Sequence, residues 1–130
     1  MPNLRIPATD RTPEVDFDFD NRHLKLKGES YPEDAARFFG PLLQAMQDFV
    51  KTRPAIPLLF DLELVYFNSS TAKALMNLFQ LLETAAKDGR DIRVNWHFAP
   101  DDETMQEFGE DFAQDFHACR FQLCPDVEVK

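Results

Sequence analysis

The amino-acid sequence predicts an α/β fold: an N-terminal β-hairpin, then a mixed sheet with helices mainly on one face. Two observations carry this prediction. Segments with the two-residue period of strands alternate along the chain with segments of helical spacing. The central strands also alternate apolar and polar residues, whereas strands buried on both faces would be apolar throughout. The second face of the sheet is therefore expected to be polar.

Four segments have the period of β-strands. VDFDFD (15–20) and HLKLKG (23–28) alternate around a short polar break, which is typical of a β-hairpin. LLFDLELVYF (58–67) and DIRVNWHF (91–98) alternate as well, and the helical segment between them predicts a right-handed parallel crossover. The polar faces of these two strands carry opposite charges: Asp61 and Glu63 on the first, Arg93 and His97 on the second.

A first helix is predicted after the hairpin. The stretch SYPED marks its start, with Ser30 as the cap and Glu33 completing a capping box. Apolar residues then recur at helical spacing as far as Val50. Gly40-Pro41 falls inside this period, and because the apolar phase continues past it we expect a kink there and not an end.

Two further helices are predicted. Apolar residues from Leu75 to Ala86 form one helix face, which closes at Gly89. Residues 101–116 form the last helix, and residues 119–123 are a candidate for a short final strand. The seven acidic residues of the last helix scatter around its axis, which favours a solvated face over a metal site. The alternative is an acidic patch that steers a basic partner.

Composition limits the classes of function. The chain has 130 residues, a length typical of one domain, and we expect residues 1–130 to form that domain. A net charge of −9 disfavours nucleic acid and anionic membrane surfaces as partners, and no apolar run is long enough for membrane insertion. The N-terminus has no apolar signal segment, and two cysteines are too few for a disulfide framework. We therefore expect a cytoplasmic protein.

The stretch VYFNSSTAKAL places a hydroxyl cluster between a strand and a helix. Asn68, Ser69, Ser70 and Thr71 are all residue types that cap helices, but one cap needs fewer of them. The cluster follows the C-terminal end of a parallel strand, where open α/β sheets place their sites. The first helical turn offers free N–H donors, no acid, and Lys73, an arrangement that favours a phosphoryl group.

Enzymatic and metal-binding functions have weaker support. A serine hydrolase would need a base near Ser69 or Ser70; His97, near the end of the neighbouring strand, is a candidate, but G-x-S-x-G is absent. Cys119 and Cys124 lack the spacing of a zinc site, so we interpret both as structural. No cofactor motif is present, the P-loop included. We expect no catalytic residue, no metal and no cofactor.

Four stretches together resemble the SiaC-type bacterial regulatory phosphoproteins, small single-domain relatives of anti-anti-sigma (STAS) proteins. They are IPATDRTPEVDFD, GESYPED, LVYFNSSTAKAL and VNWHFAPDDETMQEFGEDF, and the resemblance runs from Leu4 to Leu123. It implies a STAS-like domain without enzymatic activity, which a Ser/Thr protein kinase phosphorylates and a PP2C-type phosphatase restores. In the SiaC system the unmodified protein binds and activates a diguanylate cyclase, which promotes cyclic di-GMP synthesis and aggregation or biofilm formation. The alternative target is an anti-sigma kinase, as for an anti-anti-sigma factor.

The resemblance also implies an acceptor residue. The family's phospho-acceptor is the hydroxyl directly after the Asn of this loop, which is Ser69 here, where the best-known relatives carry Thr. In the anti-anti-sigma proteins the second Ser of an Asp-Ser-Ser motif is used, which makes Ser70 the second choice. Asn68, Ser70, Thr71 and Lys73 are then expected to shape the loop or to contact the phosphate or the partner.

Overall fold

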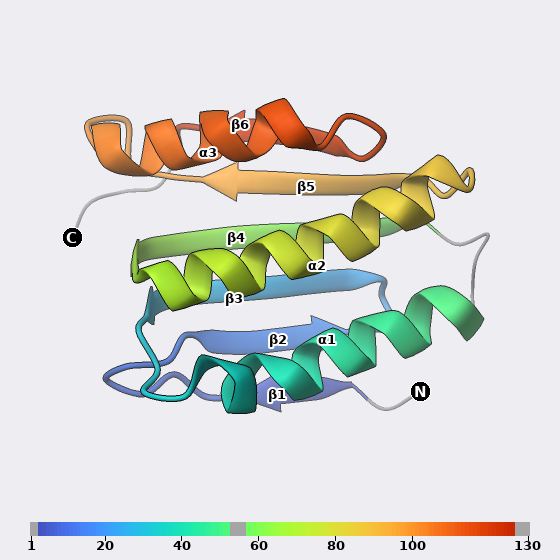
Figure 1. Cartoon of the computed structure of the whole chain (residues 1–130), viewed down its shortest axis with the longest axis horizontal. Coiled ribbons are helices and arrows are strands. Elements are labelled where there is room, and N and C mark those ends of the chain that lie inside the picture. The colour runs from blue at the N-terminus through green and yellow to red at the C-terminus, as the bar shows by residue number, and fades with distance from the viewer. Residues whose placement is uncertain (1–2, 53–56, 127–130) are drawn as a thin grey trace.

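The computed structural model describes residues 3–52 and 57–126, and it shows a six-stranded sheet with three helices in front of one face (Figure 1). The strands lie side by side in chain order and are β1 Leu4–Ile6, β2 Glu14–Asp18, β3 His23–Ser30, β4 Leu58–Phe67, β5 Ile92–His97 and β6 Arg120–Cys124. The helices are α1 Ala35–Thr52, α2 Ser69–Lys87 and α3 Glu103–Asp115. The predicted α/β class and the one-sided placement of the helices are therefore confirmed.

The sheet is mixed, as predicted. β1, β2 and β3 are antiparallel neighbours, whereas β3, β4, β5 and β6 run parallel. The predicted hairpin is β2–β3, in which Phe17 pairs with Leu24, and the predicted crossover joins β4 to β5 through α2. The candidate final strand is present as β6. β1 is an addition to the predicted elements, because three residues are too few to establish a two-residue period.

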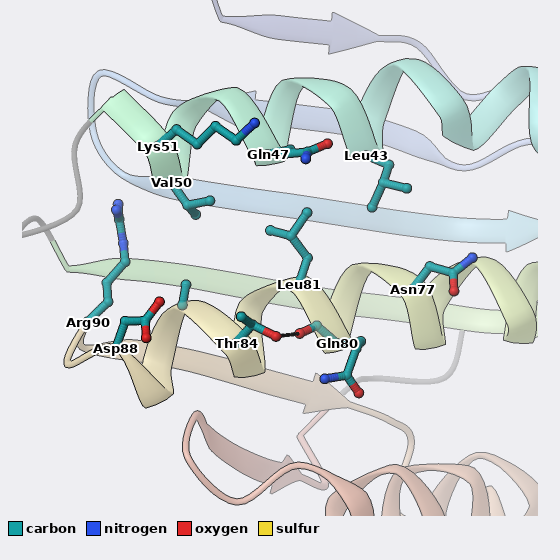
Figure 2. A pocket seen from close by; sticks show the side chains of 11 residues that line it. Leu43, Gln47, Val50, Lys51, Asn77, Gln80, Leu81, Thr84, Asp88 and Arg90 are labelled. Atoms are coloured by element: carbon teal, nitrogen blue, oxygen red, sulfur yellow. Dashed lines mark hydrogen bonds between the residues drawn. The ribbon is translucent and has the colours of Figure 1, made fainter.

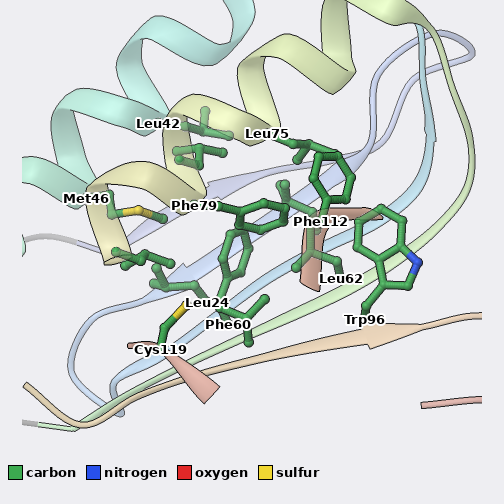
Figure 3. Close-up of a cluster of buried hydrophobic side chains, with 14 of the residues drawn as sticks. Leu24, Leu42, Met46, Phe60, Leu62, Leu75, Phe79, Trp96, Phe112 and Cys119 are labelled. Carbon is green, nitrogen blue, oxygen red and sulfur yellow. The ribbon is translucent and has the colours of Figure 1, made fainter. Parts of the chain in front are cut away.

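The hydrophobic core lies between the sheet and the helices (Figure 3). Phe60, Phe79 and Trp96 are among its largest fully buried side chains. Phe79 of α2 packs edge-on against Phe112 of α3, with 5.2 Å between the ring centroids. The second and third helices therefore share one core with the centre of the sheet.

The other face of the sheet is polar. Lys25 Nζ lies 2.9 Å from Glu63 Oε2, and His97 Nε2 lies 2.8 Å from Asp61 Oδ1. The opposite charges predicted for β4 and β5 thus meet in the pair Asp61–His97. The partner of Glu63 comes instead from β3, on the other side of β4.

The start of α1 differs from the prediction. Ser30 pairs with Phe67 as the last residue of β3 and is fully buried, so it remains extended and does not cap the helix. Asp34 takes the capping role, because its Oδ1 accepts a backbone N–H of the first helical turn at 3.1 Å. Glu33 does not complete a capping box but forms an ion pair with Arg11.

The other helix boundaries follow the predicted signals. α1 continues through Pro41, and Gly40 before it has no Cβ that would clash with the proline ring. α2 ends at Lys87, and Gly89 follows with a φ of +100°, in the left-handed region. Asp102 caps α3 through the N–H of Met105, at 3.1 Å. None of the helices in the described ranges is long and apolar enough to cross a bilayer.

Candidate functional site

The hydroxyl cluster follows β4 and includes the first turn of α2, at the C-terminal edge of the parallel strands. Asn68 has an extended backbone, with φ −91° and ψ 176°, and its Oδ1 accepts the N–H of Thr71 at 2.9 Å. Asn68 is therefore the N-cap, and Ser69, Ser70 and Thr71 are the first three residues of the helix. Because the Asn side chain fills the capping role, the three hydroxyls are available for other interactions.

Thr71 belongs to the interior of the protein. Its side chain is fully buried; its hydroxyl donates to the carbonyl oxygen of Ser30 at 3.0 Å and lies 2.9 Å from the Ser30 hydroxyl. The N–H of Asn68 donates to the same carbonyl oxygen at 3.1 Å. These bonds fasten the start of α2 to the end of β3. Thr71 can therefore hold the loop in place from the protein interior, but its side chain is not accessible to a phosphate or a partner.

Ser69 and Ser70 are exposed at the first two positions of α2. Their backbone N–H groups have no acceptor within the helix, because no helical carbonyl lies four residues before them. The helix start also carries a partial positive charge, its first turn contains no acid, and Lys73 is exposed one turn further along. This combination of a free hydroxyl, open N–H donors and a nearby ammonium suits a phosphoryl group.

The surroundings distinguish the two exposed serines. Ser70 and Lys73 line a groove of about 480 Å³ between the starts of α1 and α2. Glu33 and Asp34 line the same groove, whereas Ser69 is not among its lining residues. A phosphate on Ser70 would share this groove with Lys73, which is favourable, but also with two carboxylates, which repel it. The geometry therefore favours Ser69 over Ser70 as the carrier of a phosphate.

Large apolar side chains are exposed beside the hydroxyl cluster. Val65 has no partner in the register of β4 with β3, which marks a β-bulge. After the bulge Phe67 points into the core, whereas Val65 and Tyr66 are 54% and 53% exposed. The ring of Tyr66 contacts that of Tyr31 at 5.8 Å between centroids, and Phe67 contacts the exposed Phe108 at 4.7 Å. We call the exposed Val65, Tyr66 and Phe108, together with the half-buried Tyr31, the apolar rim. Strict alternation along β4 conceals the rim, because the bulge becomes visible only from the strand register.

A second, larger groove of about 770 Å³ runs between the C-terminal halves of α1 and α2 (Figure 2). Leu43, Val50 and Leu81 contribute its apolar lining, and Gln47 and other polar side chains lie around them. Leu43 and Asn77 line both this groove and the smaller one, so the two follow one seam between the helices. The seam is a concave surface that a binding partner could occupy.

His97 is not positioned to act on the hydroxyl cluster. Its Nε2 lies 2.8 Å from Asp61 Oδ1 and its Nδ1 lies 2.9 Å from Asp126 Oδ1, so both ring nitrogens face carboxylates on the polar side of the sheet. Ser69 begins a helix that packs on the other side. Burial lowers the pKa of His97, but hydrogen bonds to Asp61 and Asp126 outweigh it and raise the pKa. The arrangement gives no support to a serine hydrolase.

Comparisons with known proteins show the family of this chain. The model of the SiaC family regulatory phosphoproteins matches residues 6–126. An uncharacterised protein of Pseudomonas aeruginosa strain UCBPP-PA14 is 36% identical over 115 residues, which are 88% of this chain and 90% of that protein. The family description is that of a regulator that carries phosphate, and not that of an enzyme.

Solved structures share the fold. Apo-SiaC of Pseudomonas aeruginosa matches with a TM-score of 0.84 and 35% identity, over 95% of this chain and 98% of that one. SiaC in a complex with the diguanylate cyclase SiaD, where SiaC is named as the activator, matches with a TM-score of 0.85 and 35% identity, over 93% and 96% of the two chains. With the family model matching nearly the whole sequence, the chain belongs to the SiaC family of regulatory phosphoproteins.

Proposed function

We propose that this chain is a phospho-switch protein whose Ser69 is phosphorylated by a Ser/Thr kinase and restored by a PP2C-type phosphatase. In this proposal the unmodified form binds and activates a diguanylate cyclase in the cytoplasm, and thereby promotes cyclic di-GMP synthesis and aggregation or biofilm formation. The complex of SiaC with the cyclase SiaD supports this class of target. The chain acts as one domain of residues 1–130 and needs no cofactor of its own.

The observation that carries the acceptor assignment is the separate placement of the four polar residues. Asn68 caps the helix, Thr71 is buried under the loop, and Ser69 and Ser70 remain exposed. Of these two, only Ser70 lines the groove that holds Glu33 and Asp34. Ser69 is thus the exposed hydroxyl with the more favourable surroundings for a phosphate.

The switch follows from charge and hydration. The unmodified loop presents a neutral hydroxyl next to the apolar rim, a surface that a partner can cover at low cost in desolvation. Phosphorylation adds about 1.5 to 2 negative charges and strong acceptor oxygens. The phosphate on Ser69 can accept hydrogen bonds from the free backbone N–H groups of the first turn. Lys73 lies four residues further along the helix, a spacing at which its side chain can reach the phosphate. A partner that covers the loop must then bury this charge, so the phosphorylated form releases it.

A second candidate target is an anti-sigma kinase, for which the same loop and rim would provide the contact surface. Ser70 is the second candidate acceptor because it too is exposed. In both alternatives the chain is still a phospho-switch protein; only the binding partner or the phosphorylated residue differs.

The test is phosphosite mapping on the full chain after incubation with a cognate kinase, ATP and Mg²⁺. We expect one phosphate by intact mass, located on Ser69, absent in Ser69→Ala and retained in the matched control Ser70→Ala. A phosphate located outside residues 69 and 70 would overturn the site, and one located on Ser70 would establish the second candidate. Activation of a diguanylate cyclase by the unmodified chain would identify the cyclase as the target, in place of an anti-sigma kinase.

A further inference from the structure

Three side chains of metal-ligand type meet on the polar face of the sheet, where β5 and β6 end. His97 and Cys124 are direct partners in the parallel register of these strands. Asp126 is folded back toward them by a hydrogen bond from its N–H to the carbonyl oxygen of Cys124, at 2.9 Å. One ring nitrogen, the thiol sulfur and one carboxylate oxygen of this trio all lie within 4.8 Å of one another. Backbone pairing and a tight turn therefore assemble the trio.

A further carboxylate orients the imidazole of His97. Its Nδ1 faces Asp126 Oδ1 at 2.9 Å, and its Nε2 faces Asp61 Oδ1 at 2.8 Å. Asp61 is held in turn by Asn95 Nδ2 at 3.0 Å and by His23 Nε2 at 2.6 Å. Histidines that bind a metal through one nitrogen almost always donate the other N–H to a carboxylate, carbonyl or water, which fixes the ring and its tautomer. The network thus supplies the outer support that a metal-binding His97 requires.

We propose that His97 Nδ1, Cys124 Sγ and the Asp126 carboxylate form a binding site for a zinc-type divalent cation, with Asp61 as the positioning residue. Nitrogen, thiolate and carboxylate oxygen are the ligands of zinc, whereas calcium and magnesium take oxygen ligands. Bonds of about 2.0 to 2.3 Å place tetrahedral ligands about 3.3 to 3.7 Å apart, so His97 Nδ1 and Asp126 need to separate by only a few tenths of an ångström. Water or a donor from a partner takes the fourth position.

The chemistry of the cation site is independent of the phospho-switch, because it uses none of the residues of the hydroxyl cluster. Its ligands tie β6, the last strand of the sheet, to β5. A bound cation would therefore stabilise the end of an edge strand, which otherwise presents unpaired backbone groups. A cation that binds the folded chain would add stability that rises with the logarithm of the ratio of its concentration to its dissociation constant.

The test uses the full chain, freed of metal with a chelator and then titrated with Zn²⁺ by calorimetry, and with Co²⁺ by absorption spectroscopy. We expect one equivalent of Zn²⁺, a rise of the melting temperature, and with Co²⁺ a thiolate-to-metal charge-transfer band together with the visible bands of tetrahedral coordination. Asp61→Asn should weaken Zn²⁺ binding about 10- to 100-fold, as for other outer partners of ligating histidines. Ca²⁺ should not bind.

Two variants and one control decide the assignment. Cys124→Ser should abolish the charge-transfer band and weaken Zn²⁺ binding, and its half-buried position makes it the variant least harmful to folding. His97→Gln should weaken binding as well, with far-ultraviolet circular dichroism confirming the fold. The exposed His117 gives the matched control, His117→Gln, which should bind as the parent chain does. No binding at micromolar Zn²⁺, or binding that survives both Cys124→Ser and His97→Gln, overturns the proposal.

Discussion

The hydroxyl of Thr71 donates to the carbonyl oxygen of Ser30, 3.0 Å away, although the two residues are 41 positions apart in the chain. Both side chains are fully buried, and the bond joins the start of α2 to the end of β3. The same carbonyl accepts the N–H of Asn68, so the loop that displays Ser69 is anchored twice. The exposure of Ser69 is therefore built into the fold and does not depend on a partner.

Thr71→Val tests this anchor. Valine keeps the shape of threonine but leaves the buried Ser30 hydroxyl without its partner, so we expect the free energy of unfolding to fall by about 1–3 kcal/mol. Urea unfolding measures the change. Ser70→Ala is the matched control on the same helical turn, and because Ser70 is exposed it should stay within about 0.5 kcal/mol of the parent. Equal stability of both variants would show that the Thr71–Ser30 bond does not anchor the loop.

Ser69→Asp tests the switch apart from stability. A carboxylate at the first position of α2 interacts favourably with the helix dipole, so the variant should unfold at the same or slightly higher urea concentration. Binding to the cyclase should weaken at least about tenfold, equivalent to about 1.4 kcal/mol, because the charge must be desolvated beside the apolar rim. Ser69→Ala should bind and activate as the unmodified chain does. A Ser69→Asp variant that is stable and still binds fully contradicts the mechanism.

The strand and helix pattern could be predicted because it depends on local periodicity, but two local signals were decided by tertiary pairing. Ser30 is the cap that the sequence predicts for α1, but pairing of β3 with β4 extends to Ser30, and Asp34 caps the helix instead. Thr71 looks like its neighbours Ser69 and Ser70 in the sequence, and only the packing of α2 on the sheet buries it. Local patterns thus predict the elements, while long-range contacts decide which member of a local group is used.

The two cysteines also show that local sequence patterns do not determine the role of a single residue. Cys119 is buried, and burial followed by the Glu83 carboxylate raises the pKa of its thiol to about 12, which fits the predicted structural role. Cys124 lies instead on the polar face beside His97. Asp126 lies two residues after Cys124, but His97 comes from another strand, so the strand register is needed to find the three together.

Gly109→Ala tests how α3 packs on the sheet. A Cβ at this position would lie 2.5 Å from Trp96 Cδ1 and would also collide with Leu123. We expect overpacking to cost about 1–3 kcal/mol, offset in part by the better helix propensity of alanine, of about 1 kcal/mol. Thermal unfolding measures the net loss, and the fluorescence of Trp96, the only tryptophan in the chain, reports the local displacement. Gln114→Ala, exposed on the same helix, should change neither quantity.

Glu83 is a buried carboxylate of α2 whose oxygens accept three backbone N–H groups from the segment between α3 and β6. The donors are His117, Ala118 and Cys119, each at 3.0 Å. Burial alone would raise the pKa of Glu83, but these backbone hydrogen bonds outweigh it and lower the pKa below its ordinary value of 4.5. Glu83 therefore holds the segment before β6 in place more strongly when it is ionised than when it is protonated.

The pH dependence of Glu83→Gln tests this role. A carboxyl whose pKa is lower in the folded than in the unfolded state stabilises the fold above the unfolded pKa, and this contribution is lost as the pH falls through the folded pKa. At pH 7 we expect the variant to be less stable by about 1.5–3 kcal/mol, since it loses hydrogen bonds to a charged group. The difference from the parent should stay constant down to about pH 5 and shrink below it, because Glu83 is then protonated first in the unfolded state and, at lower pH, in the folded state. Urea midpoints of both proteins between pH 7 and pH 3 measure it, and a difference that does not shrink at low pH would show that shape, and not charge, accounts for the loss.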